Sequence, residues 1–149
     1  MLLLSRRSLL AIAAVVDIAL HARPMPVSAK AMAARHNLPP RHLEPILQAL
    51  VRQGILKGLR GPRGGYEVAR ERRRISAGDI VRAAMTATGE EALAPLPESK
   101  LVDLVVEPVV KQATAAFLRE LDAVTVEDLC RDAEAKAAVD KPPAVDFTI

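Results

Sequence analysis

The segment from Ser28 to Ala69 constrains the fold most, because it reads as two short helices followed by a hairpin. Ser28 can cap the first helix, and Asn37 suits the left-handed residue that ends it. The second helix is expected to open near Pro40 and to stop at Gly54. Its apolar residues recur at spacings of three and four, as in a helix with one buried face: Leu43, Ile46, Leu47, Leu50 and Val51. Two helices joined by a few residues form a helix-turn-helix.

The rest of this segment predicts a β-hairpin. Two short strands, Ile55–Leu59 and Tyr66–Ala69, flank a turn rich in glycine and proline. A helix-turn-helix followed by such a hairpin is a winged helix-turn-helix. The expected fold class is therefore mainly α with a small β-hairpin wing, and a long C-terminal helix is added to it.

Charge is divided unequally along the chain. Residues 1–85 carry 15 Lys and Arg against 5 Asp and Glu, for a net charge of +10, whereas residues 86–149 carry 6 against 13, for −7. The basic half suits a polyanion. Only Tyr66, Phe117 and Phe147 are aromatic, and surfaces that stack single-stranded nucleic acid or RNA bases depend on aromatic side chains. Double-stranded DNA is the expected partner.

The second helix of the helix-turn-helix can lie in the major groove of DNA. Its N-terminal, outward face carries four polar side chains that are predicted to contact bases: Arg41, His42, Glu44 and Gln48. Arg and Gln read guanine and adenine edges, and Glu can accept from cytosine. Pro45 cannot donate to the carbonyl oxygen of Arg41, which predicts either a loosened first turn or a helix that starts later than Pro40.

Cations on the hairpin and at the chain's start are predicted to contact phosphates. The hairpin carries Lys57, Arg60 and Arg63 around glycines that let the backbone approach a phosphate closely. Such contacts make affinity depend on salt and carry little sequence information unless a side chain enters the minor groove. Arg6 and Arg7 open the predicted first helix, where they are free to reach a phosphate as well.

Residues 1–22 combine an arginine pair with an apolar run, so they resemble a twin-arginine export signal. Asp17 and His21 interrupt the run, and Leu9–Val16 is too short to span a membrane. Cleavage near Ala33 would also remove half of the helix-turn-helix. The segment is therefore predicted to be a buried first helix, and the protein is predicted to be cytoplasmic and not bound to a membrane.

The C-terminal part of the chain is predicted to be helical. Ser76 and Asp79 form a capping box that opens a helix through Met85. Apolar residues at helical spacing then extend over Glu98–Ala123, and Pro108 is expected to kink or divide that helix. One small domain cannot bury so long a stripe against itself, so the same helix of a second chain is the expected partner.

These elements divide the chain into four parts. We predict a winged helix-turn-helix DNA-binding domain over residues 1–85, a loop over 86–97, a helical dimerisation region over 98–139 and a tail over 140–149. Thr125 is expected to cap the last helix of the dimerisation region.

Three motifs and the order of elements resemble the Rrf-two family of bacterial winged helix-turn-helix regulators. Its members include an iron–sulfur cluster regulator, a nitric-oxide-sensitive repressor and a cysteine-metabolism repressor. The motifs are R-G-P-R-G-G-Y at Arg60–Tyr66, I-S-A-G-D-I-V at Ile75–Val81 and L-P-P-R-H-L-E at Leu38–Glu44, and the resemblance covers roughly residues 4–138. It implies a homodimer that binds a palindromic operator and represses transcription.

The resemblance also implies roles for single residues. Arg7 matches a basic residue near the start of the first helix that lies close to DNA. The base-reading positions of the recognition helix fall on Arg41, His42 and Glu44. Arg60 and Pro62 fall on wing positions that enter the minor groove.

Cluster-binding members hold iron–sulfur with three cysteines in the loop after the fourth helix. The matching loop here, Thr86–Pro97, contains none, and the single cysteine of the chain, Cys130, lies in the last predicted helix. The chain therefore resembles the cluster-free branch, and we predict no cofactor. Cys130 could act as a redox switch if its thiolate were stabilised and accessible. Its neighbours Asp128 and Asp132 offer no electropositive pocket, which favours a plain buried or half-buried cysteine.

The sequence thus predicts a homodimeric, sequence-specific transcriptional repressor whose effector, a small molecule or a protein, it does not identify. His21, His36 and His42 are not spaced as metal ligands, and no catalytic triad or phosphate-binding glycine loop is recognisable, so an enzyme is not expected. The alternative is a helical protein–protein adaptor that uses the winged fold without DNA. Salt-dependent affinity for DNA would distinguish the two.

Overall fold

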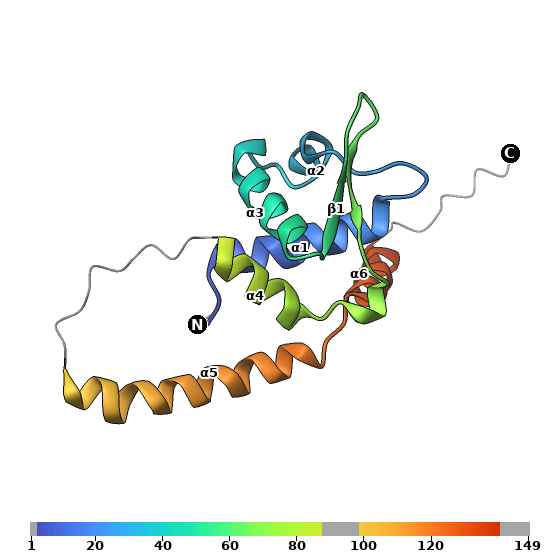
Figure 1. Cartoon of the computed structure of the whole chain (residues 1–149). Coiled ribbons are helices and arrows are strands. Elements are labelled where there is room, and N and C mark those ends of the chain that lie inside the picture. Colours follow the sequence, from blue (N-terminus) through green and yellow to red (C-terminus); the bar gives the residue numbers. More distant parts are fainter. Residues whose placement is uncertain (1–2, 88–98, 141–149) are drawn as a thin grey trace, which may run out of the picture.

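The computed structural model describes residues 3–87 and 99–140, and their arrangement is mainly helical with one antiparallel hairpin. The elements in chain order are α1 Arg6–His21, α2 Ala29–Arg35, α3 Pro40–Arg52, β1 Leu56–Leu59, β2 Gly65–Val68, η1 Arg72–Arg74, α4 Ala77–Ala87, η2 Val102–Val106, α5 Glu107–Asp122 and α6 Val126–Asp140. Figure 1 shows α1 across the middle, with α2, α3 and the hairpin on one side, α4 on the other, and α5 along the outside. The predicted fold class is confirmed.

Helix α1 lies at the centre of the hydrophobic core. Ser5 caps it by accepting a 3.2 Å hydrogen bond from the amide of Ser8. The residues that it buries completely are small or branched: Ala11, Ala14, Val15 and Ile18. Small side chains let neighbouring helices approach closely, and α3, α4 and α6 all pack against α1. The predicted buried helix is present.

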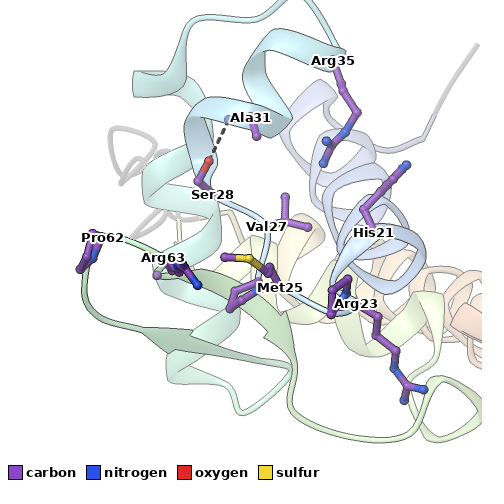
Figure 2. A pocket seen from close by; sticks show the side chains of 12 residues that line it. His21, Arg23, Met25, Val27, Ser28, Ala31, Arg35, Pro62 and Arg63 are labelled. Atoms are coloured by element: carbon purple, nitrogen blue, oxygen red, sulfur yellow. Dashed lines mark hydrogen bonds between the residues drawn. The ribbon is translucent and has the colours of Figure 1, made fainter.

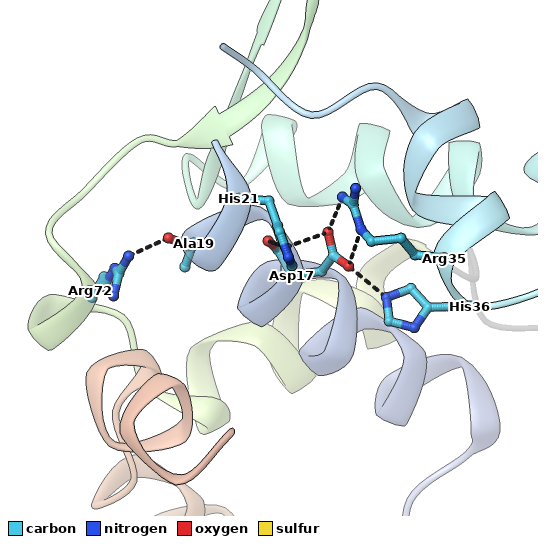
Figure 3. Close-up of polar contacts among 6 residues, drawn as sticks. All are labelled: Asp17, Ala19, His21, Arg35, His36 and Arg72. Atoms are coloured by element: carbon cyan, nitrogen blue, oxygen red, sulfur yellow. Dashed lines mark hydrogen bonds and ion pairs between the residues drawn. The ribbon is translucent and has the colours of Figure 1, made fainter. Parts of the chain in front are cut away.

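Asp17 is the buried charge of α1, and its carboxylate is 5% exposed. Arg35 donates from Nε to Oδ2 at 3.1 Å and from Nη2 to Oδ1 at 2.6 Å, and His36 Nε2 lies 2.7 Å from Oδ2. His21 Nδ1 lies 2.8 Å from the main-chain oxygen of Asp17 (Figure 3). A buried carboxylate is tolerated only when it is paired in this way, so the cluster ties the end of α2 to α1.

The helix-turn-helix forms as the sequence predicts. Ser28 accepts a hydrogen bond from the amide of Ala31, and Asn37 adopts a left-handed φ of 53°. Helix α3 begins at Pro40 as expected, so of the two alternatives for the effect of Pro45 the later start is excluded. Its first turn is closed by a 3.0 Å bond from the amide of His42 to the carbonyl of Pro39, three residues earlier. The helix continues through Pro45 because its apolar face holds it against the core.

The wing is a two-stranded ribbon anchored to the segment before α2. Each strand lies one residue from its predicted bounds, and Leu56 pairs with Val68. Val27 forms a bridge with Tyr66, with N–O distances of 2.9 and 2.7 Å. Position 65 must be glycine, because a Cβ there would lie 2.5 Å from the carbonyl oxygen of Val27. Residues 22–27, whose two prolines suggest a linker, therefore hold the wing in place through Val27.

Both predicted capping boxes in the C-terminal half are confirmed. The amide of Asp79 donates to Ser76 Oγ at 3.0 Å, and that of Asp128 donates to Thr125 Oγ1 at 3.1 Å. The predicted division of the long helix takes the form of the π-helical turn η2, immediately before Pro108. Proline has no N–H for the carbonyl four residues earlier, and a π-turn changes the bonding register there.

Helix α6 packs against α1 and η1, which the sequence analysis did not foresee. Val126 and Cys130 lie in the same hydrophobic core as α1. Arg72 of η1 donates to the main-chain carbonyl of Ala19 at the end of α1 (Figure 3). The predicted loop over 86–97 and the tail over 140–149 lie almost entirely outside the described residues.

Helix α5 is held to the rest of the chain at its C-terminal end. Arg82 of α4 donates to both oxygens of Asp122 at 2.7 and 2.8 Å. A Cβ at Gly78 would lie 1.9 Å from Asp122 Oδ1, so the carboxylate occupies the space that a side chain would need. Glycine at this position leaves room for the carboxylate in its pair with Arg82.

The substitution Asp17→Asn tests the charge cluster. Removing one partner of a buried pair typically costs about 3 kcal/mol, and we expect a loss of that order in the free energy of unfolding at pH 7. Burial acts to raise the pKa of Asp17, but hydrogen bonds from Arg35 and His36 outweigh it and hold the pKa below 3.8. A folded pKa below the unfolded one means that the stabilisation is present above pH 4 and is lost as the pH falls.

Urea denaturation at pH 7 and at pH 3 measures both effects. The difference in the free energy of unfolding between wild type and D17N should be smaller at pH 3 than at pH 7. Asp132→Asn, which removes only an exposed pair with Lys136, is the control and should change stability by less than about 1 kcal/mol. An equal difference at both pH values would contradict the ionic role of Asp17.

Candidate nucleic-acid interface

One side of the molecule carries the wing tip, α2 and the first turn of α3, and α5 lies on the opposite side (Figure 1). All nine residues predicted to contact DNA are exposed: Arg7, Arg41, His42, Glu44, Gln48, Lys57, Arg60, Pro62 and Arg63. A side chain has to be exposed to contact DNA, and none of these nine is buried in the core.

Helix α3 separates an apolar face from a polar one. Leu43, Ile46, Leu47 and Leu50 are at most 2% exposed and hold the helix on the core. Arg41, His42 and Glu44 lie in the exposed first turns, where a helix inserted by its N-terminal end would meet base edges. The arrangement supplies a guanidinium, an imidazole and a carboxylate for hydrogen bonds to bases.

Gln48 differs from the other polar residues of α3. Its Nε2 donates to Tyr66 Oη at 3.2 Å, so the amide ties α3 to the wing. One of the two amide hydrogens is engaged in this way, so the second hydrogen and the side-chain oxygen are the groups available to DNA. The sequence pattern gave no signal of this contact, because Tyr66 is 18 residues away along the chain.

The start of α1 and the start of α3 together form a groove of about 670 Å³. Arg6, Arg7, Arg41 and His42 border it, and Leu9, Leu10, Leu38 and Ile46 are among its apolar lining residues. The structure therefore brings Arg7 beside Arg41 and His42, two of the residues predicted to contact bases. A residue that contacts a phosphate next to α3 would have to lie in such a position.

The cations of the wing are not equivalent. Lys57 pairs with Glu67 on the opposite strand at 2.9 Å, which partly neutralises its charge. Arg60 and Arg63, in contrast, make no ion pair with any residue that the structure describes. The wing tip thus offers two unpaired guanidinium groups, and Lys57 is the weaker candidate for a phosphate contact.

A second group of cations was not identified from the sequence. His21, Arg23 and Arg35 line a cleft of about 390 Å³ with Pro62, Arg63 and Gly64 of the wing tip (Figure 2). The segment of residues 22–27 reads as a linker, and only its pairing with Tyr66 brings it beside the wing. In the sequence, only Arg23 beside the prolines of this segment indicated that basic residues gather here.

Cys130 is 1% exposed, in the part of α6 that packs on the core. Burial raises the pKa of its thiol above 9.0, and the charge of Arg72 opposes this only in part. A reactive cysteine needs an accessible thiolate, so these surroundings give no support to a redox role. Within residues 3–87 and 99–140, no group of three or more His, Cys, Asp or Glu is arranged to hold a metal ion.

No helix among the described residues is both long and apolar enough to cross a lipid bilayer.

Relatives of this chain are transcriptional regulators. A protein named as an HTH-type transcriptional regulator in Synechocystis sp. is 37% identical over 135 residues, which cover 87% of this chain and 88% of the relative. The protein rrf2 of Nitratidesulfovibrio vulgaris is 30% identical and covers 79% of this chain and 80% of its own length.

Solved structures have the same fold. IscR of T. potens superposes with a TM-score of 0.68 at 32% identity, and the match covers 91% of this chain and 90% of that structure. CymR, the global cysteine regulator of B. subtilis, gives a TM-score of 0.64 at 28% identity over 88% of this chain and 98% of its own.

A family model described as "Rrf2: Iron-dependent Transcriptional regulator" matches residues 4–132. The residues here do not fit an iron–sulfur cluster, because the chain has one cysteine and that cysteine is buried in the core. The match nevertheless covers most of the chain, and the relatives and structures agree with it. The chain belongs to the Rrf2 family of winged-helix, DNA-binding transcriptional regulators.

Proposed function

We propose that this Rrf2-family protein is a homodimeric repressor that binds a palindromic operator without an iron–sulfur cluster. The observation that carries the proposal is the polar, exposed start of α3 beside two unpaired arginines at the wing tip. A helix and a wing arranged in this way suit adjacent major and minor grooves of one duplex.

In this proposal α3 reads the operator sequence. Arg41 and Glu44 have the side-chain groups that distinguish guanine and cytosine edges, and His42 lies beside them. Arg60 and Pro62 enter the minor groove, where an arginine is attracted by the negative potential of a narrow groove. Arg7 contacts a phosphate from the start of α1, and Gln48 and Lys57 contribute less because each already has a partner within the chain.

The exposed apolar stripe along η2 and α5 supports a dimer. Leu101, Leu104 and Val109 are 67%, 74% and 65% exposed, and Val105 and Val110 lie among them at 55% each. A patch of this kind on a folded protein usually marks an interaction surface. A second copy is the natural occupant, because an isologous contact between two identical helices gives the two-fold symmetry of a palindrome.

The domain organisation follows from this assignment. Residues 1–85 form the DNA-binding unit, and η2 with α5 forms the dimerisation arm within 98–139. Helix α6 packs on the DNA-binding unit, since Val126 and Cys130 belong to its core. Repression is the simplest outcome, because a protein bound tightly across a promoter is sufficient to block transcription.

Titration onto DNA from upstream of the protein's own gene tests the proposal. Random DNA of equal length serves as the comparison, at three salt concentrations and with protein purified without oxygen and treated with a chelator. We expect preferential binding that falls with salt and is unaffected by the chelator. Weak binding that ignores both sequence and salt would favour the adaptor alternative, and binding lost with the chelator would contradict the cluster-free assignment.

Two substitutions separate base reading from phosphate and groove contact. Glu44→Ala should reduce the preference for the operator over a base-substituted operator by about tenfold, since a good base contact contributes about 1–3 kcal/mol of discrimination. Arg60→Ala should weaken binding to all DNA. It should also reduce by about 0.9 the steepness with which log affinity falls against log salt concentration, here called the salt slope. Electrophoretic mobility shift or fluorescence anisotropy measures both, with Arg119→Ala on α5 as the control. If E44A lost the same affinity for the operator and for the base-substituted operator, another face of the protein would have to read the bases.

The double substitution Leu104→Glu, Val109→Glu tests the dimer. Charge in the centre of an apolar contact should leave a folded monomer, visible by analytical ultracentrifugation with an unchanged circular dichroism spectrum. Loss of the second reading helix should lower operator affinity on the order of 10²-fold, to that of a half-site. Thr114→Glu, exposed on α5 and about 140° around the helix from Val109, is the control. A variant that remains dimeric would exclude this face as the interface.

A further inference from the structure

The cleft between the wing tip and the first helix of the helix-turn-helix is assembled from three separate segments. Figure 2 shows Pro62 and Arg63 on the wing, Ser28 and Ala31 at the start of α2, and Met25 between them. The cleft has a volume of about 390 Å³. Its shape is fixed by the main-chain bridge between Val27 and Tyr66, so the wing and the linker cannot separate without breaking that bridge.

The charge of this cleft is one-sided. His21, Arg23, Arg35 and Arg63 line it, and its lining includes no acidic side chain. Arg23 and Arg63 form no ion pair with any part of the chain that the structure describes. A concave site lined by one sign of charge concentrates ions of the opposite sign, and the apolar side chains of Pro24 and Met25 strengthen this by limiting screening.

Two side chains that line the cleft, Arg35 and His21, are positioned by Asp17 (Figure 3). Arg35 uses Nε and Nη2 to bind the carboxylate, so Nη1 is left for another acceptor. His21 Nδ1 lies 2.8 Å from the main-chain oxygen of Asp17, which fixes the direction of the ring. Because Asp17 compensates Arg35, the unbalanced charge of the cleft comes from Arg63, with Arg23 extending from the rim (Figure 2).

The position of the cleft indicates what it binds. When a recognition helix lies in a major groove and a wing lies in the adjacent minor groove, one sugar–phosphate backbone separates them. That backbone has to pass between the helix-turn-helix and the wing tip. The cleft lies between the wing tip and α2, the first helix of the helix-turn-helix (Figure 2).

We propose that this cleft is a phosphate-binding site, that Arg63 is its principal cation, and that a backbone phosphodiester of DNA occupies it. This inference rests on the proposed DNA binding and adds His21, Arg23 and Arg35 to the interface. The contact is sequence-independent: it sets the register of the wing on the duplex and contributes to affinity through counterion release.

A methylphosphonate scan of the operator combined with Arg63→Ala tests the site. Each backbone phosphate in turn is replaced by a neutral methylphosphonate, and affinity is measured by anisotropy for wild type and R63A. Replacement of the phosphate at one position near the wing should lower the affinity of the wild type. The same replacement should not lower the affinity of R63A any further, because both changes remove the same contact. R63A should also lower the salt slope by about 0.9 without changing sequence preference.

Matched variants separate this contact from general effects of charge. Arg63→Lys should restore the slope, since a phosphate accepts from an ammonium group too. Arg119→Ala removes the same charge from α5 and should leave the slope unchanged. The wing tip carries no hydrogen bond from Arg63 to any described residue, so R63A should retain its melting temperature. A wild-type slope in R63A would overturn the proposal.

A parallel calorimetric titration with inorganic phosphate distinguishes the two sources of the anion. Saturable binding to DNA-free protein that is lost in R63A, together with an unaltered DNA slope, would overturn the assignment to DNA and place a free phosphate-bearing ligand in the cleft. If wild type itself shows no salt-dependent binding to DNA, the proposed function fails. If wild type binds DNA in a salt-dependent way and R63A has the same salt slope, the proposed function stands and only the assignment of the cleft is wrong.

Discussion

A single buried carboxylate governs where the DNA-binding helices can lie. Asp17 sits in the helix around which the core is built, and a charge in that position is tolerated only while its partners are in place. Arg35 and His36 are those partners, and both lie at the end of α2. Since α3 follows α2 after a very short turn, the orientation of the reading helix relative to the core depends on this cluster.

The wing is positioned by contacts of a different kind. Main-chain pairing between Val27 and Tyr66 joins it to the segment before α2, and the hydroxyl of Tyr66 accepts a hydrogen bond from Gln48 on α3. Tyr66 therefore connects the linker, the wing and the recognition helix. The absence of a side chain at Gly65 permits this junction, and the absence of one at Gly64 lets the turn pass close to the carbonyl oxygen of Leu59.

Local features were predictable from the sequence, and distant contacts were not. Caps such as Ser28 and the left-handed Asn37 act within a few residues, so their signals are complete in the sequence. Periodicity shows which face of a helix is buried but not which element covers it, so the packing of Cys130 against α1 was missed. The ion pair of Arg82 with Asp122 joins residues 40 positions apart, and no sequence pattern announces it. For the same reason no sequence pattern indicated the cleft between the wing tip and α2, whose lining residues come from separate segments.

The joint between α4 and α5 gives one position unusual influence over the operator. The carboxylate of Asp122 fills the space beside Gly78, so a larger residue there would have to displace that carboxylate from its pair with Arg82. In a dimer built on α5, this joint sets the distance and the angle between the two recognition helices. The number of base pairs between operator half-sites is then determined, in part, far from the DNA, by a residue that has no side chain. A methyl group at position 78 would press on the carboxylate that holds α5 to α4, and in such a dimer it would shift the two recognition helices relative to each other.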